Sequence, residues 1–287
     1  MRTKKGKKII SILALSILLL AALWVGGCGQ KKDAEKGENG QTEKLSGSIT
    51  VAGSTSVQPF SEVLAEKFMA DNPDIQINVQ GGGSSQGIAA AASGAADIGA
   101  SSRELKEEEK KQGLKEYVIA YDGIAVIVHP SNKIDNLKKE DIKNIYLGNI
   151  TNWKEVGGDD APITVICREA GSGTRGAFEE IVMEKEDITS KAIIQNSTGA
   201  VRTTVAGDKN AIGFVSLPAV NDEVKAIKVD GTEANKENVK NKSYKIARPF
   251  IYLTKGEPTG AVKAFIDFVL SDEGQKIIED EGAVRIK

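Results

Sequence analysis

The stretch "APITVICREAGSGTRGAFEEIVM", Ala161 to Met183, contains a strand pattern, a glycine-rich turn and a helix pattern in one continuous run. The apolar residues of "ITVI" predict a short buried strand, and "GAFEEIVM" continues as a helix. Between them, "CREAGSGTRG" places an arginine, glycines, a serine and a threonine where the strand ends. This composition is typical of a simple turn, but it also suits a loop that binds an anion.

The same strand, turn and helix unit recurs along the chain, without a repeat of fixed length. In the first helix pattern, Val57, Phe60, Leu64 and Phe68 have helical spacing, and the pattern stops at Pro73. Such alternation predicts an α/β fold, a mainly parallel sheet with helices on both faces. The expected strands are 48–53, 74–80, 96–102, two segments of 117–130 broken at Asp122-Gly123, 161–168, the end of 198–217, and 245–256; a charged helix is expected within 103–113 and two amphipathic helices within 259–284.

Three turns rich in Ser, Thr and Gly follow predicted strands and precede predicted helices: 53–56, 83–85 and 171–174. Ligands of open α/β sheets bind at this edge, and a helix N-terminus offers free N–H groups and partial positive charge. Taken alone, each turn is more typical of an ordinary N-cap. Together with Arg168, whose guanidinium can hold two oxygens, the three turns favour a shared site for a tetrahedral oxyanion.

The N-terminus has the pattern of an export signal. Residues 1–8 carry five cations, residues 9–25 are apolar, and "VGGC" places small residues before Cys28. This ending resembles the lipobox of bacterial lipoproteins, so we expect a signal peptide over 1–27 and a lipidated Cys28. An uncleaved single-span anchor is the alternative. Residues 28–46 are polar and charged, which predicts a flexible tether.

The composition excludes several classes of function. Of 38 Lys and Arg residues, five lie in the signal peptide, which leaves 33 against 40 Asp and Glu, a net charge of about −7. This balance argues against a nucleic-acid partner. Beyond Cys28 the only cysteine is Cys167, so a disulfide framework is excluded and Cys167 is expected to be a small core residue. One histidine and no spaced set of carboxylates give no metal site, and no cofactor motif occurs.

Several segments resemble one known family: "VAGSTSVQPF", "QGGGSSQGI", "ADIGASSREL", "DGIAVIVHP", "REAGSGTRGAF", "GAVRTTVAG" and "AIGFVSLP". In order and position they are similar to the phosphate-binding lipoproteins that supply phosphate-specific ABC importers. The resemblance implies a two-lobed periplasmic-binding-protein fold of type II, with mixed sheets and two hinge crossings near 122–128 and 247–253. It implies a lobe 1 formed by 47–127 plus 248–287 and a lobe 2 formed by 128–247.

The resemblance also implies that inorganic phosphate binds between the lobes and is delivered to ABC permease subunits. The protein would be a binding receptor and not an enzyme, a monomer, and lipid-anchored on the outside of the membrane, most simply that of a Gram-positive cell. The implied phosphate contacts are Thr55 and Ser56 in the first loop, Ser84 in the second, and Arg168, Ser172, Gly173 and Thr174 in the third.

One position departs from the family pattern. Best-known members carry an aspartate after "GAS" that accepts the proton of hydrogen phosphate, whereas this chain has Ser102 followed by Arg103. We include both as candidate ligand residues; Arg103 either neutralises the ligand or holds the loop through a carboxylate. A serine discriminates less well against a fully deprotonated anion, so receptors for sulfate, molybdate or tungstate remain alternatives.

A lipid-anchored serine hydrolase is a further alternative. "GSSQG", residues 83–87, fits the G-x-S-x-G pattern of a nucleophile elbow, with Ser85 as the nucleophile. Such an enzyme needs a histidine base, and only His129 is present. A position beside Pro130 at a strand end is more typical of a surface residue, and the resemblance places Ser84 at the ligand instead.

Overall fold

The computed structural model describes residues 45–286. The predicted signal peptide, the lipidation site at Cys28 and most of the predicted tether lie outside the described residues. Lys44–Lys287 form one compact unit. Within residues 45–286, no helix combines the length and the apolar character that crossing a bilayer requires.

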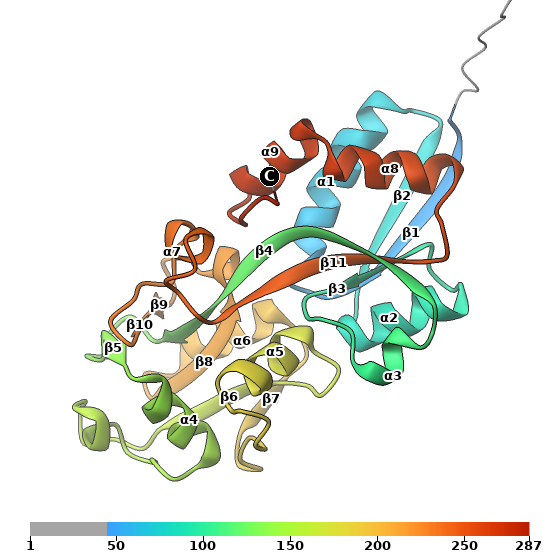
Figure 1. Cartoon of the computed structure of the whole chain (residues 1–287). Coiled ribbons are helices and arrows are strands. Elements are labelled where there is room, and N and C mark those ends of the chain that lie inside the picture. The colour runs from blue at the N-terminus through green and yellow to red at the C-terminus, as the bar shows by residue number, and fades with distance from the viewer. Residues whose placement is uncertain (1–44, 287) are drawn as a thin grey trace, which may run out of the picture. The chain divides into compact units, whose positions relative to one another are not determined.

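Strands and helices alternate along most of this unit (Figure 1). The first helix follows its predicted pattern, with Pro59 in its first turn, where the missing N–H costs no bond, and an end just before Pro73. The strands are β1 Gly47–Gly53, β2 Ile75–Gly81, β3 Ile98–Ser101, β4 Leu114–Val128, β5 Asn136–Leu137, β6 Thr164–Arg168, β7 Ile193–Gln195, β8 Ala211–Ser216, β9 Lys225–Ala226, β10 Lys228–Val229 and β11 Ala247–Lys255. The α-helices are α1 Gln58–Asp71, α2 Ser84–Ser93, α3 Glu107–Lys110, α4 Lys139–Leu147, α5 Gly173–Ile181, α6 Thr198–Gly207, α7 Lys236–Lys240, α8 Gly260–Leu270 and α9 Asp272–Asp280, with short 3-10 turns η1 Trp153–Val156 and η2 Leu217–Ala219.

The main sheet is mixed, with the order β2-β1-β3-β11-β4-β8-β6-β7 and β9 paired to β4. Its two ends are parallel: β1 pairs with β2 and β3, and β6 pairs with β7 and β8. Its middle is antiparallel, because β11 pairs with β3 and β4, and β4 pairs with β8. The mainly parallel sheet expected from the alternation is therefore wrong for the centre, where the two longest strands run in opposite directions.

The predicted break at Asp122-Gly123 is also wrong, because β4 runs through it as one strand. Gly123 pairs with Ala247 and Asp122 with Arg248 of β11, so the ladder continues without a turn. A β-carbon on Gly123 would lie 2.8 Å from the Val239 side chain. The glycine thus permits a close approach between neighbours in place of a turn.

The unit contains two large hydrophobic cores. The first is formed by β1, α1, α8 and neighbouring segments, and the helical pattern Val57, Phe60, Leu64 and Phe68 is buried in it. We call the part around this core lobe 1. Phe60 packs edge-on against Phe250, with ring centroids 5.5 Å apart. The four residues with helical spacing therefore share the buried face of this helix.

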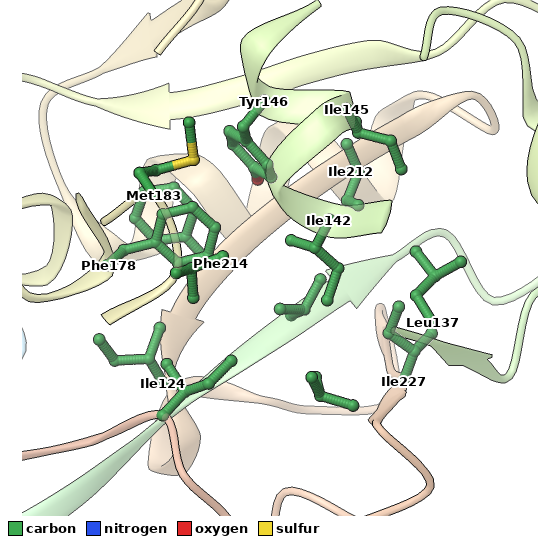
Figure 2. Packing of buried hydrophobic residues seen from close by; sticks show 14 of the residues in the cluster. Ile124, Leu137, Ile142, Ile145, Tyr146, Phe178, Met183, Ile212, Phe214 and Ile227 are labelled. Carbon is green, nitrogen blue, oxygen red and sulfur yellow. The ribbon is translucent and has the colours of Figure 1, made fainter. Parts of the chain in front are cut away.

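The second core is formed by β4, β8, α4 and α5 (Figure 2), and we call the part around it lobe 2. Phe178 and Phe214 stack with their ring centroids 4.0 Å apart, and Tyr146 packs against both. Cys167 is fully buried here, as the composition predicts.

Strands β4 and β11 belong to both lobes. Ile119 and Ala120 of β4 pack in the first core, whereas Ile124 and Val126 pack in the second. Phe250 of β11 lies in the first core. The chain therefore crosses between the lobes twice, close to the facing pair Asp122 and Arg248.

Candidate functional site

The donor-rich turns meet where the two lobes face each other. Lobe 1 contributes the residues that follow β1 and β3 and the first residues of α2. Lobe 2 contributes the end of β6 and the first residues of α5 and α6. Three helix N-termini and three strand ends therefore converge, which is the edge of an α/β sheet at which ligands bind.

Hydroxyl groups join the lobes at this point. Ser56 Oγ lies 2.9 Å from Thr174 Oγ1 and 2.9 Å from Thr198 Oγ1, both across the lobe boundary. Thr55 Oγ1 accepts from the Thr198 N–H at 3.3 Å. Within lobe 1, Ser54 Oγ donates to Ser102 Oγ at 2.8 Å. Apart from half-buried Thr55, these residues are buried, and we call them, with Ser84, the hydroxyl cluster.

Ser84 joins the hydroxyl cluster from the start of α2. Its Oγ accepts from the Ser102 N–H at 3.0 Å and lies 3.4 Å from Ser102 Oγ. The preceding Gly83 has φ +92, a conformation that favours glycine and turns the chain into the helix. The next residue, Ser85, donates its N–H to the Gly171 carbonyl at 3.0 Å, a direct backbone bond between the lobes.

Arg168 supplies positive charge from lobe 2. Its Nε and Nη2 atoms donate to the two carboxylate oxygens of Glu169, each at 2.8 Å. Its Nη1 donates to Thr198 Oγ1 at 3.1 Å. Only 1% of Arg168 is exposed, so the guanidinium meets a carboxylate on one edge and the hydroxyl cluster on the other.

The donors at the start of α5 have two different roles. Ser172 is the N-cap, and its Oγ accepts from the Arg175 N–H at 3.2 Å, so its side chain has the capping role that any such serine can have. The helix offers no carbonyl to the N–H groups of Gly173 and Thr174 in its first turn. Those N–H groups, with Thr174 Oγ1 in the hydroxyl cluster, suit an anionic oxygen.

Arg103 lies beside the hydroxyl cluster without a hydrogen bond to it. Its two terminal nitrogens donate to the two oxygens of Glu109, each at 2.7 Å, and Nη1 also donates to the Glu104 carbonyl. Nη2 reaches Ser85 Oγ at 3.2 Å. Of the two roles expected for Arg103, these contacts favour the one that holds the loop through a carboxylate.

Three residues of this region were not predicted from the sequence: Asp122, Thr198 and Arg248. Ser54 lies in the predicted turn 53–56 but was not named as a contact. Arg248 donates through Nε and Nη2 to Asp122 Oδ2, at 3.1 and 2.9 Å, and both side chains are buried. It also donates to Ser102 Oγ at 3.2 Å and to Ser56 Oγ at 3.3 Å. For Asp122 and Arg248 the sequence contains a signal, because each is a charged residue within a strongly apolar strand and the two charges are opposite.

Burial dominates the electrostatics of the Asp122–Arg248 pair. It raises the pKa of Asp122, and the Arg248 charge opposes that rise. It lowers the pKa of Arg248, the Asp122 charge opposes that fall, and the Arg168 guanidinium adds to it. The Arg168 charge thus disfavours the charged form of Arg248, and an anion bound near both would offset this effect.

The two residues of the hydrolase alternative have other partners. Ser85 Oγ accepts from Arg103, and His129 Nδ1 is bonded to Ser131 within its own loop, at 2.8 Å from Oγ. Across residues 45–286, no group of three or more His, Cys, Asp or Glu side chains is arranged to hold a metal ion. The geometry supports anion binding better than a nucleophile and base.

A cavity of about 220 Å³ adjoins the hydroxyl cluster. Thr55 and Ser56 of lobe 1 and Thr198 of lobe 2 form part of its wall, and Arg202 of α6 lines it further out. The rest of its wall is of mixed character, because Arg202 and Glu281 lie there among apolar residues.

Comparisons with known proteins give one consistent result. Residues 38–273 match the model of the PBP superfamily domain. The phosphate-binding protein PstS of Bacillus subtilis is 35% identical over 291 residues, which cover 99% of this chain and 95% of that protein.

Solved structures agree. A putative phosphate ABC transporter substrate-binding protein from Clostridium perfringens, with bound phosphate, is 50% identical with a TM-score of 0.82, covering 84% of this chain and all of that one. An ABC-type phosphate transport receptor from Vibrio cholerae is 38% identical with a TM-score of 0.71, covering 82% and 99%. These similarities confirm the predicted two-lobed periplasmic-binding-protein fold.

Proposed function

The chain belongs to the PstS family of phosphate-binding proteins, and on that basis we propose that it captures inorganic phosphate outside the cytoplasm and delivers it to an ABC permease. Relatives named for phosphate binding cover nearly the whole chain, and one solved relative contains phosphate. The observation that carries the proposal for this chain is the buried convergence of Arg168 with hydroxyl donors of both lobes.

The proposed ligand set has neutral donors on one side and a guanidinium on the other. Hydroxyl and backbone N–H donors suit an oxyanion because they add no net charge, and Arg168 supplies the cation. Arg103 is assigned to holding the loop beside Ser102, on the strength of its two bonds to Glu109. The proposed phosphate contacts are Thr55, Ser56, Ser84, Ser102, Arg168, Ser172, Gly173 and Thr174, to which the contacts of the hydroxyl cluster add Thr198.

Binding and delivery need two states of the lobes. We assign residues 47–127 and 248–287 to lobe 1 and 128–247 to lobe 2, so that β4 and β11 contain the hinge. The last residues of the first segment, such as Ile124, already pack in the second core, which supports a crossing of β4 near Asp122. An anion held by both lobes favours the closed state through its extra contacts there. The closed state then docks on the permease, without any chemical step, which makes the protein a receptor and not an enzyme.

Another tetrahedral oxyanion is the second candidate ligand, because of Ser102. Ser102 Oγ accepts from Ser54 and from Arg248, so its own proton is directed to another acceptor, either Ser84 Oγ at 3.4 Å or a bound anion. A donating serine does not exclude sulfate or molybdate, unlike the aspartate that the family pattern has at this position.

Calorimetry with phosphate, sulfate and molybdate tests the proposal directly. We expect phosphate to bind most tightly and to raise the unfolding temperature as it stabilises the native state. Tight binding of sulfate or molybdate without binding of phosphate would reject phosphate as the ligand while leaving the oxyanion site in place. No binding of any of the three would reject the site itself.

The location of the protein is a separate part of the proposal. We propose that Cys28 is acylated after removal of residues 1–27, and that the tether holds a monomeric receptor on the outer face of a Gram-positive membrane. Mass spectrometry of the mature N-terminus measures the acyl chains. A Cys28→Ala variant should lose them and leave the detergent phase on partitioning, whereas unchanged partitioning would support the single-span anchor.

A further inference from the structure

Asp122 and Arg248 form a buried ion pair on the two strands that cross between the lobes. They are direct partners in the ladder of β4 and β11. The side chains are 0% and 1% exposed, and two nitrogens of Arg248 donate to Asp122 Oδ2. A buried pair of this kind is weak evidence for stability, because desolvation of the charges offsets their attraction. The position of the pair, between the two lobes, points to a role other than stability.

The far edge of the Arg248 guanidinium faces the hydroxyl cluster. Nη1 donates to Ser102 Oγ at 3.2 Å and Nη2 donates to Ser56 Oγ at 3.3 Å. Both serines belong to the donor loops that follow β1 and β3 of lobe 1. The Asp122 carboxylate meanwhile accepts the Leu217 N–H of lobe 2 at 3.2 Å through Oδ1. The pair therefore links the ligand loops of one lobe to the backbone of the other.

Arg168 and Arg248 are arranged in the same way. Each donates through Nε and Nη2 to a carboxylate, Glu169 in one case and Asp122 in the other. Each directs remaining N–H groups to hydroxyls of the same cluster, Arg168 from lobe 2 and Arg248 from the crossing strands. The Arg168 charge contributes to the lowered pKa of Arg248, in keeping with their contacts to the same hydroxyl cluster. Both guanidinium groups therefore meet the same group of hydroxyls.

We propose that Arg248 is a second guanidinium ligand of the bound anion and that Asp122 is the positioning residue that fixes its orientation. This inference rests on the proposed function, since it assigns a further ligand to the same site. The carboxylate holds one edge of the fork, so the N–H groups that reach Ser56 and Ser102 are already oriented when the anion arrives. The anion would then meet two guanidinium groups, those of Arg168 and Arg248, and the Ser102 hydroxyl as a neutral donor.

The test is phosphate affinity by calorimetry, measured well below the unfolding midpoint of each variant. We expect Arg248→Lys, which keeps the charge but loses the fork, to bind phosphate about tenfold more weakly or worse. Asp122→Asn should also weaken binding, although Asp122 does not contact the anion. Arg248→Met combined with Asp122→Asn removes the pair without leaving a buried charge alone, in case a single variant fails to fold.

Lys143→Met is the matched control. Lys143, in α4, is also a buried cation, and it pairs with Glu184 and Glu186 but has no part in the proposed site. It should lower the unfolding midpoint and leave phosphate affinity within about twofold of the wild type. Wild-type binding together with unchanged affinity in the Arg248 and Asp122 variants would overturn this inference and leave the proposed function standing. A wild-type protein that binds no phosphate would overturn the proposed function as well.

Discussion

Gly173 of α5 and Ser84 of α2 touch across the lobe boundary so closely that a β-carbon on Gly173 would lie 2.2 Å from Ser84 Oγ. The same β-carbon would lie 2.6 Å from Ser102 Oγ. Real β-carbons essentially never approach a heavy atom below 3.0 Å. Glycine at position 173 therefore permits the N-terminus of α5 to reach the hydroxyl cluster of lobe 1.

Gly173→Ala should weaken phosphate binding by hindering the approach of the lobes. Overpacking of a tight contact typically costs about 1 to 3 kcal/mol, so we expect a loss of about 5- to 150-fold. Gly199→Ala is the control, because Gly199 also lies in the first turn of a lobe 2 helix, but a β-carbon there would have no neighbour within 4 Å. Calorimetry measures both variants, and equal affinities would contradict the close approach.

Arg168→Ala should weaken phosphate binding while the protein stays folded. A hydrogen bond from a charged group is typically worth about 1.5 to 3 kcal/mol, which corresponds to about 10- to 150-fold in affinity. The fold should survive because the abandoned Glu169 is 28% exposed and can reach water. Arg285→Ala, at an exposed arginine, provides the comparison. Affinity equal to that of the wild type would show that the anion site lies elsewhere.

Local patterns predicted much of the fold and one side of the site. The apolar spacing of α1 and the glycine turn before α5 are local signals, and the structure has both elements there. Arg168 and the residues of its loop could be named because the strand, the turn and the helix follow one another in the sequence. Ser56 and Thr198 lie 142 positions apart, and a contact over such a separation leaves no local pattern in the sequence. Thr198 was therefore not predicted.

Sequence patterns predict the crossing strands least well. Asp122-Gly123 has the composition of a turn, but the pairing with Ala247 and Arg248 keeps the strand continuous there. Arg248 lies 126 residues from its partner. The tertiary contacts of β11 thus override the turn propensity of Asp122-Gly123, at the position where the two lobes are joined.

Ser102→Asp should separate phosphate from sulfate. A carboxylate at this position can accept the proton of hydrogen phosphate but repels an anion without a proton. We expect sulfate binding to fall much more than phosphate binding, by at least about tenfold in the ratio of affinities. Phosphate binding by this variant should improve as the pH falls and more of the phosphate is protonated.

Ser102→Asn controls for size, because Ser102 is fully buried and any larger side chain crowds Gly173. Asparagine has the shape of aspartate without its charge, so it should weaken both anions by similar factors. The same phosphate-to-sulfate ratio in the Asp and Asn variants would mean that position 102 does not determine selectivity.

Glu109→Gln should destabilise the protein without changing phosphate affinity. Burial alone would raise the pKa of Glu109, but the hydrogen bonds from Arg103 and from the Lys106 N–H outweigh it and hold the pKa below its ordinary value. The stabilisation is therefore complete above the ordinary pKa of a glutamate, about 4.3, and is lost as the pH falls through the lower pKa of the folded protein. Chemical unfolding at neutral pH should show a loss of about 1 to 3 kcal/mol, which narrows at acid pH.

Glu107→Gln is the matched control on the same helix, since Glu107 is 84% exposed and pairs with Lys110 at the surface. Surface pairs contribute little, so this variant should unfold like the wild type. Phosphate affinity then distinguishes the two roles of Arg103. If Arg103 only holds the loop beside Ser102, both variants bind phosphate like the wild type, whereas a large change confined to Glu109→Gln would place Arg103 at the anion, because a guanidinium released from its carboxylate would alter the charge that the ligand meets.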